Sequence, residues 1–137
     1  MLNKAEIKRV IKEYCLQNKN IIAVYIFGSF IRGTFNQNSD IDLALMLKAE
    51  LDKMAAFDLK LKVATELEEL LGIEVDTVIF SRADLRLKQQ IIKGELIIGK
   101  KNKLRVRRES RVVDDYLDMK YFYDLYEQNL GKGFRNG

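Results

Sequence analysis

The chain has 137 residues, of which 47% are hydrophobic and 32% charged, which predicts one domain with a real core and a well-solvated surface. It contains no histidine, which excludes Ser-His-Asp and Cys-His catalysis and histidine-ligated zinc. The net charge of +4 fits a nucleotide or an acidic partner surface, but it is too small to predict binding to duplex nucleic acid. A single cysteine and the lack of a signal peptide or long apolar span lead us to expect a cytoplasmic protein without a membrane segment.

The first 27 residues predict a helix followed by a strand. Asn3 and Glu6 fit a helix cap, and apolar residues at helical spacing predict an amphipathic helix over 4–17. Cys15 lies on the apolar face of this helix, so we interpret it as a small core residue rather than a reactive thiol. The continuous apolar run 21–27 is typical of a strand buried on both faces.

A glycine turn follows this strand directly. Because Gly28 has no Cβ, a phosphate can approach its backbone closely. The N–H groups at the start of the short helix expected next, together with the Ser29 hydroxyl, can then bind that phosphate. Arg32 lies one helical turn past Gly28 and either meets a phosphate or pairs within the motif, or it is an ordinary surface arginine.

Two carboxylates begin the next strand, in which Ile41, Leu43 and Leu45 are apolar. Asp40 and Asp42 share one face of the strand, about 7 Å apart at Cα. Such a pair of like charges is costly on a largely buried strand, and a divalent cation such as Mg²⁺ resolves the conflict. A phosphate-binding turn beside paired carboxylates is what metal-assisted phosphoryl or nucleotidyl transfer requires.

A helix and a further strand follow. Asp52 caps a helix that Gly72 ends, and six of its apolar residues are expected to lie in the core. These are Met54, Phe57, Leu61, Ala64, Leu67 and Leu71. The strand 74–80 carries two acids, Glu74 and Asp76, on the same face as the apolar Val78, which is unusual.

The C-terminal part is expected to contain two helices and an edge strand. Ser81-x-x-Asp84 predicts the cap of a helix over about 82–93, and 95–98 predicts a short strand. A basic run from Lys100 leads into a helix to about Asn129, which either packs on the sheet with a charged outer face or forms a partner surface. We expect a single domain over 1–130 and a disordered tail over 131–137.

The central motif resembles the signature of the DNA polymerase β nucleotidyltransferase superfamily. The shared pattern is Gly28-Ser29, ten intervening residues and Asp40-x-Asp42. The fuller form Gly-Ser-x-x-Arg-Gly…Ser-Asp-Ile-Asp-Leu is similar to its minimal nucleotidyltransferases, the MNT proteins. The expected fold is α/β, with a small mixed β-sheet backed by helices and followed by a long C-terminal helix.

The resemblance implies a role for each motif residue. The β- and γ-phosphates of ATP would bind at Gly28 and Ser29, and Mg²⁺ at Asp40 and Asp42. In the superfamily, a third acid helps to bind a second ion and activates the acceptor hydroxyl; Asp76 matches it by order and strand position, with Glu74 as its rival. Ser39 either orients the acidic pair or is a simple turn serine. The expected sites are the nucleotide-binding residues Gly28, Ser29, Arg32 and Ser39 and the catalytic, metal-binding residues Asp40, Asp42 and Asp76.

The resemblance also implies a partner. Minimal nucleotidyltransferases commonly act as the antitoxin beside a HEPN-domain toxin, a ribonuclease, and transfer AMP from ATP to a toxin tyrosine. We therefore expect an antitoxin of a HEPN/MNT pair, with the toxin encoded next to it and able to form an oligomer with it. Two alternatives stay open: an enzyme with a small-molecule acceptor such as an aminoglycoside, and a non-catalytic antitoxin that neutralises its toxin by binding.

Overall fold

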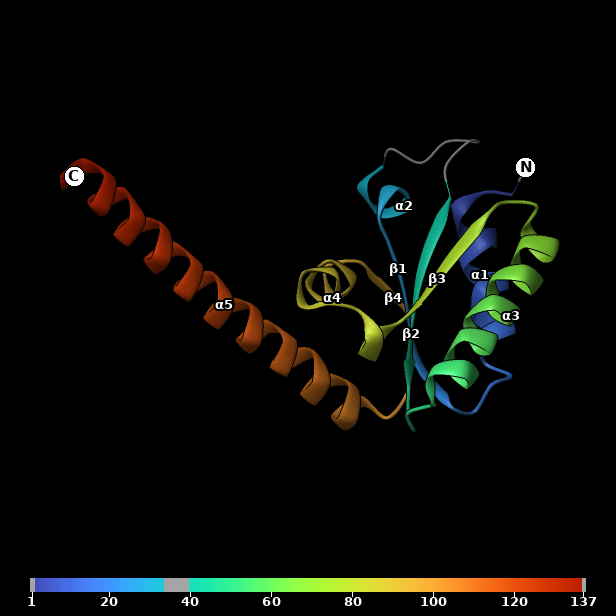
Figure 1. Ribbon diagram of the computed structural model, residues 1–137. Helices are drawn as coiled ribbons and strands as arrows, with labels where there is room; N and C mark the ends of the chain where they lie inside the picture. Colours follow the sequence, from blue (N-terminus) through green and yellow to red (C-terminus); the bar gives the residue numbers. More distant parts are fainter. Residues whose placement is uncertain (1, 34–39, 137) are drawn as a thin grey trace.

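The computed structural model describes residues 2–33 and 40–136, and in it helices cover both faces of a small sheet (Figure 1). The order of elements follows the sequence-based expectation closely. In chain order they are α1 (Lys4–Cys15), β1 (Ile21–Phe27), α2 (Ser29–Arg32), β2 (Ile41–Leu47), α3 (Lys53–Leu71), β3 (Val75–Ile79), a 3₁₀ turn (Phe80–Arg82), α4 (Leu85–Ile92), β4 (Glu95–Gly99) and α5 (Asn102–Asn136).

The four strands form one mixed sheet in the order β3-β2-β1-β4. β1 runs antiparallel to both β2 and β4, whereas β2 and β3 are parallel. Parallel neighbours need a crossover connection, and α3 supplies it. The expected α/β architecture with a mixed sheet and a long C-terminal helix is therefore confirmed.

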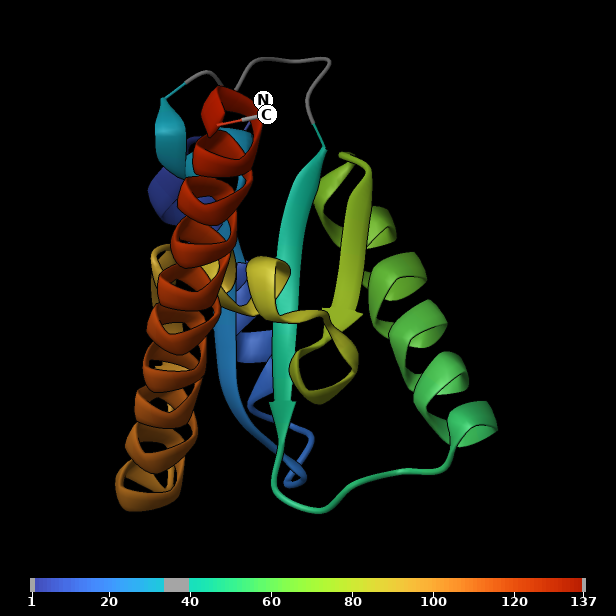
Figure 2. The ribbon, with the colours of Figure 1, turned by 60° about the vertical axis from the view of Figure 1, so that its left-hand side comes forward.

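The two faces of the sheet are covered by different helices (Figure 2). α1 and α3 pack on one face around a large apolar core that includes Ile11, Leu43 and Leu67. α4 and the beginning of α5 pack on the other face, where Tyr25, Met46 and Ile91 belong to a smaller cluster. The carboxylates of the central motif lie on this second, less completely covered face.

Local signals account for the start and end of several elements. The Asn3 side chain accepts a hydrogen bond from the backbone N–H of Glu6 at 2.8 Å, and the Asp52 side chain accepts one from Ala55 at 2.8 Å. α3 ends at Gly72, whose φ of 68° is the left-handed conformation that glycine favours. Cys15 is buried in the core, as expected, and burial raises the pKa of its thiol to about 12.

The expected core face of α3 is wrong at three positions. Met54, Phe57 and Leu61 are exposed, with relative accessibilities of 55–71%. The residues that α3 does bury include Ala56, Val63, Leu67 and Leu71. Because α3 is apolar on more than one side, two sets of residues follow helical spacing, and only packing on the sheet selects between them.

The cap of α4 is Asp84 rather than Ser81. The strand ends at Ile79, and the 3₁₀ turn places Ser81 before the helix, where its hydroxyl donates to Glu50 Oε2 at 2.7 Å. The Asp84 side chain accepts from the backbone N–H of Leu87 at 2.8 Å, so α4 begins at Leu85. The predicted 82–93 helix is correspondingly shorter.

α5 is longer than expected and has two distinct parts. Near its start, Arg108 donates to the backbone oxygen of Leu47 at 2.6 Å, the Tyr25 hydroxyl donates to Glu109 at 3.0 Å, and Val112 is buried. Further on, the helix projects away from the sheet (Figure 1). It continues to Asn136, past the expected end at about Asn129 and into the tail expected to be disordered. Of the helices in residues 2–33 and 40–136, none combines the length and apolarity needed to cross a membrane.

Candidate active site

Four acids lie at the amino-terminal ends of β2 and β3, in two neighbouring pairs. The parallel register places Asp42 beside Asp76, and the backbone N–H of Ile41 donates to the oxygen of Glu74 at 2.9 Å. Side chains on neighbouring parallel strands in register point to the same face, about 4.8 Å apart at the backbone. Asp40 and Glu74 each precede their strand by one position, so they lie on that face too. The acids that the sequence analysis took from two separate segments are thus brought together.

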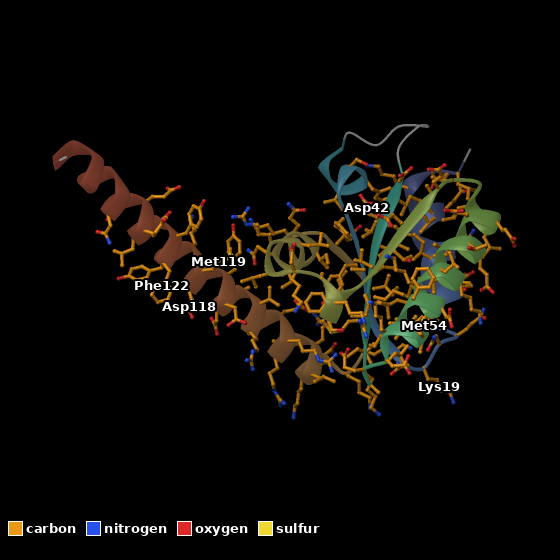
Figure 3. The ribbon with its side chains drawn as sticks, in the orientation of Figure 1. Lys19, Asp42, Met54, Asp118, Met119 and Phe122 are labelled. Carbon is orange, nitrogen blue, oxygen red and sulfur yellow. The ribbon has the colours of Figure 1, made fainter. Side chains whose placement is uncertain are left out.

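The glycine turn lies directly against the first acidic pair. β1 pairs Phe27 with Asp42, so the chain enters the turn beside this aspartate. A Cβ built on Gly28 would stand only 2.2 Å from Asp42 Oδ2, and Gly28 has a φ of 77°. Both the left-handed conformation and the close approach of the carboxylate require glycine here. Figure 3 shows Asp42 near the upper end of the sheet, close to α2.

The second acidic pair is electrostatically strained. A hydrogen bond with the Asp40 carboxyl and the negative charge of Asp40 raise the pKa of Glu74 above its usual range. Both side chains are exposed, so the repulsion between them is moderated by solvent. A bound cation would remove the conflict, because it attracts both carboxylates.

The donor set fits a hard cation. All the candidate ligands are carboxylate oxygens, which suit Mg²⁺, and the Gly28 turn lies directly against the Asp42 carboxylate. Across the part of the chain that the structure describes, no three acids converge closely enough to surround one ion. The acids instead stand as two neighbouring pairs, Asp42 with Asp76 and Asp40 with Glu74.

Two of the expected nucleotide-binding residues cannot be placed. Ser39 lies outside the described residues, as does the side chain of Arg32. Arg32 is the last residue of α2, and Gly33 follows it with a φ of 80°. Ser29 is the first residue of α2, immediately after the Gly28 turn.

One contact near the site was missed by the sequence analysis. Lys4 Nζ donates to the backbone oxygen of Phe30 at 3.0 Å and stands 5.0 Å from the centre of its ring. Lys8 lies 5.9 Å from the same ring and forms an ion pair with Glu95 at 2.7 Å. Phe30 is buried in the core cluster that also contains Ile7 and Ile11, so α1 holds α2 in place. No local pattern could have revealed this contact, because its partners are far apart in the sequence.

Comparison with known proteins shows the family of this chain. The family model for Polymerase beta, Nucleotidyltransferase matches residues 9–103. A curated relative, protein adenylyltransferase MntA of Shewanella oneidensis, is 38% identical over 69 residues, which cover 50% of this chain and 47% of the relative. The matched segment therefore spans about half of that relative's length.

Solved structures share the fold at low sequence identity. A toxin–antitoxin crystal structure with AMP-PNP has a TM-score of 0.70 at 24% identity and covers 90% of this chain and 97% of its own. A structure of tri-AMPylated Shewanella oneidensis HEPN toxin in complex with MNT antitoxin has a TM-score of 0.63 at 19% identity, covering 90% and 98%. Since the family model spans more than half of the sequence, the chain belongs to the polymerase beta nucleotidyltransferase family.

Proposed function

We propose that this protein transfers AMP from ATP to a tyrosine hydroxyl of a partner HEPN toxin and so acts as its antitoxin. The observation that carries this proposal is the contact between the Gly28 turn and the Asp42 carboxylate, with Asp76 in register beside it. This arrangement places a turn that can bind a phosphate beside paired acids that can bind a metal, and nucleotidyl transfer needs both. The curated relative is named a protein adenylyltransferase, and one solved relative is an MNT antitoxin with an AMPylated HEPN toxin.

In this proposal, separate residues bind the nucleotide and the metal. The backbone N–H groups at Gly28 and Ser29 would bind the β- and γ-phosphates of ATP, and Arg32 and Ser39 would add contacts to the nucleotide. Asp40, Asp42 and Asp76 would hold Mg²⁺, with two ions expected. The bound metal would supply positive charge that stabilises the triphosphate and the departing pyrophosphate.

Asp76 would also act as the general base. It would accept the proton of the tyrosine hydroxyl as that oxygen bonds to the α-phosphorus, while the bond from the α-phosphorus to the bridging oxygen breaks and pyrophosphate leaves. Asp76 is exposed, so an incoming hydroxyl can reach it. Its register beside Asp42 favours it over Glu74, which pairs with Asp40. We place this reaction in the cytoplasm, where a toxin made from the neighbouring gene is met directly.

Intact-mass spectrometry of the toxin encoded next to this gene tests the proposal. The toxin is incubated with ATP, Mg²⁺ and either the wild-type protein, Asp42→Asn, or Asp58→Asn, a control at an exposed acid of α3. We expect the toxin mass to increase by one or more AMP groups with the wild type and with Asp58→Asn, and to stay unchanged with Asp42→Asn.

The other outcomes separate the alternatives. An equal mass shift with Asp42→Asn would contradict the proposed site. A toxin that co-purifies and is neutralised without a mass shift would favour an antitoxin that acts by binding. If the toxin neither shifts nor binds, transfer from labelled ATP to an aminoglycoside would favour a small-molecule acceptor.

A further inference from the structure

The projecting part of α5 is poorly supported by the rest of the chain. Among its described side chains beyond Val112, none is buried, and Tyr116 and Met119 are only partly covered. Figure 3 shows Asp118, Met119 and Phe122 on the segment that extends away from the sheet. In proteins most helical stability comes from tertiary packing of one face of the helix. The stability of this segment therefore calls for a further contact.

Apolar side chains follow one line along the outside of α5. Val106, Val113, Leu117 and Tyr121 recur at helical spacing on a side of α5 that is turned away from the buried Val112. We call these four residues the outer stripe. Their relative accessibilities are 36–63%, so the stripe is an exposed apolar surface that runs along both parts of the helix. Apolar side chains left exposed along a helix in this way form a candidate interaction surface.

The charges beside the outer stripe change sign along the helix. Arg107 and Arg111 flank its first half, and Asp114 and Asp118 flank its second half on the same side. All four side chains are exposed. Arg111 lies 3.9 Å from Asp115 of the same helix, but both side chains are largely in solvent, so this pair contributes little. The surface is therefore basic at one end and acidic at the other.

We propose that α5 pairs with α5 of a second copy of this chain, antiparallel and about a two-fold axis close to Val113. In that arrangement Tyr121 of each copy packs against Val106 of the other, and Leu117 packs over the small Ser110. Antiparallel pairing is isologous, so each contact occurs twice. It also covers the projecting part of each helix, as far as about Leu125, with the anchored part of its partner, which begins at Asn102.

The charges beside the outer stripe favour a second copy of this chain as the partner of α5, and they favour the antiparallel orientation. In an antiparallel pair the same flanks face each other, so Arg107 and Arg111 of one copy meet Asp118 and Asp114 of the other. The charged pairs and the apolar pairs are all centred within one residue of Val113, so a single axis satisfies both sets. A parallel pair would instead place this flank against the opposite flank of the partner, so these arginines and aspartates would not meet.

Light scattering after size-exclusion chromatography tests the pairing with the purified chain alone. We expect the wild type to show twice the 16.0 kDa chain mass at micromolar concentrations and to dissociate on dilution or in high salt. The variant R107D/R111D should weaken dimerisation about tenfold or more, because four attractive pairs become repulsive. D114R/D118R should weaken it similarly, and L117D should do so by burying a charge in the stripe.

The charge-swapped variant R107D/R111D/D114R/D118R is the decisive control, since it should restore the dimer. E127K changes an exposed acid of α5 outside the flank and should leave the dimer intact. Circular dichroism confirms that each variant is folded. A wild type that is monomeric at every concentration would overturn the proposal and leave α5 to a different protein. A swapped variant that stays monomeric while folded would also overturn it.

Discussion

The two faces of β2 have different roles, since one packs in the apolar core and the other carries the acids. Ile41, Leu43 and Leu45 point to the face covered by α1 and α3 and are fully buried. On the other face, Asp42 is half-buried and Asp40 is exposed just before the strand. Because side chains alternate along a strand, the buried face fixes the register of the acidic one. Burial on one side thus holds two charged groups in place on the other.

The clearest way to separate the faces is to change one residue on each. Asp42→Asn should abolish nucleotidyl transfer, because it removes a charge that holds the metal, while the protein stays folded. Leu43→Ala should lower the free energy of unfolding by about 2–5 kcal/mol, since it opens a cavity in the core, and leave the activity per folded molecule largely unchanged. Denaturant titration and transfer assays measure the two effects. A stable but inactive Leu43→Ala would contradict this division.

The glycines of the turn offer a second comparison. Gly28→Ala should abolish transfer and destabilise the protein, because its Cβ would collide with the Asp42 carboxylate. Gly33 has a similar positive φ of 80°, but nothing lies within 4 Å of a Cβ there. Gly33→Ala should therefore cost only the conformational strain, about 1–2 kcal/mol. If both variants lose activity equally under conditions where they are folded, the collision with Asp42 is not the reason.

A third comparison distinguishes the acids of β3. We expect Asp76→Asn to lower kcat by about 10²–10⁴-fold, as the loss of a general base does. Glu74→Gln should have a much smaller effect, because Glu74 stands beside Asp40 rather than Asp42. Steady-state rates of AMP transfer measure both. A larger loss with Glu74→Gln would assign the role of third acid to Glu74.

The smallest expected effect concerns stability and pH. The pKa of Glu74 is raised in the folded protein, so its contribution to stability is present in acid and is lost as the pH rises through that pKa. Glu74→Gln resembles the protonated state and should have a slightly higher Tm than the wild type at pH 7. The difference should vanish below the ordinary pKa of a glutamate. Thermal melts across pH measure it, and an unchanged or lower Tm at pH 7 would contradict the repulsion.

Local signals in the sequence were enough for most of the fold and for the juxtaposition at the site. The apolar run of β1, the caps at Asn3 and Asp52, and the left-handed Gly72 each act over a few residues, so their patterns predict the elements correctly. The spacing from Gly28 to Asp42 predicts a turn next to an acidic strand, and the structure brings the two into contact.

The remaining features depend on packing between distant segments. Which side of α3 is buried is decided by the sheet, so the exposure of Phe57 could not be predicted from helical spacing. The contact of Lys4 with Phe30 joins α1 to α2. The register of Asp42 with Asp76 is set by the parallel pairing of β2 with β3, which α3 connects. Spacing alone contains no information about such pairings.

Calorimetric titration with a non-hydrolysable ATP analogue tests the central claim, that the acidic face of β2 holds ATP together with Mg²⁺, without requiring the acceptor. We expect the wild type to bind the analogue in Mg²⁺ and to lose that binding in EDTA. Asp42→Asn should bind at least about tenfold more weakly, which corresponds to about 1.4 kcal/mol. Binding of equal strength by the wild type and a folded Asp42→Asn, with and without Mg²⁺, would contradict the account.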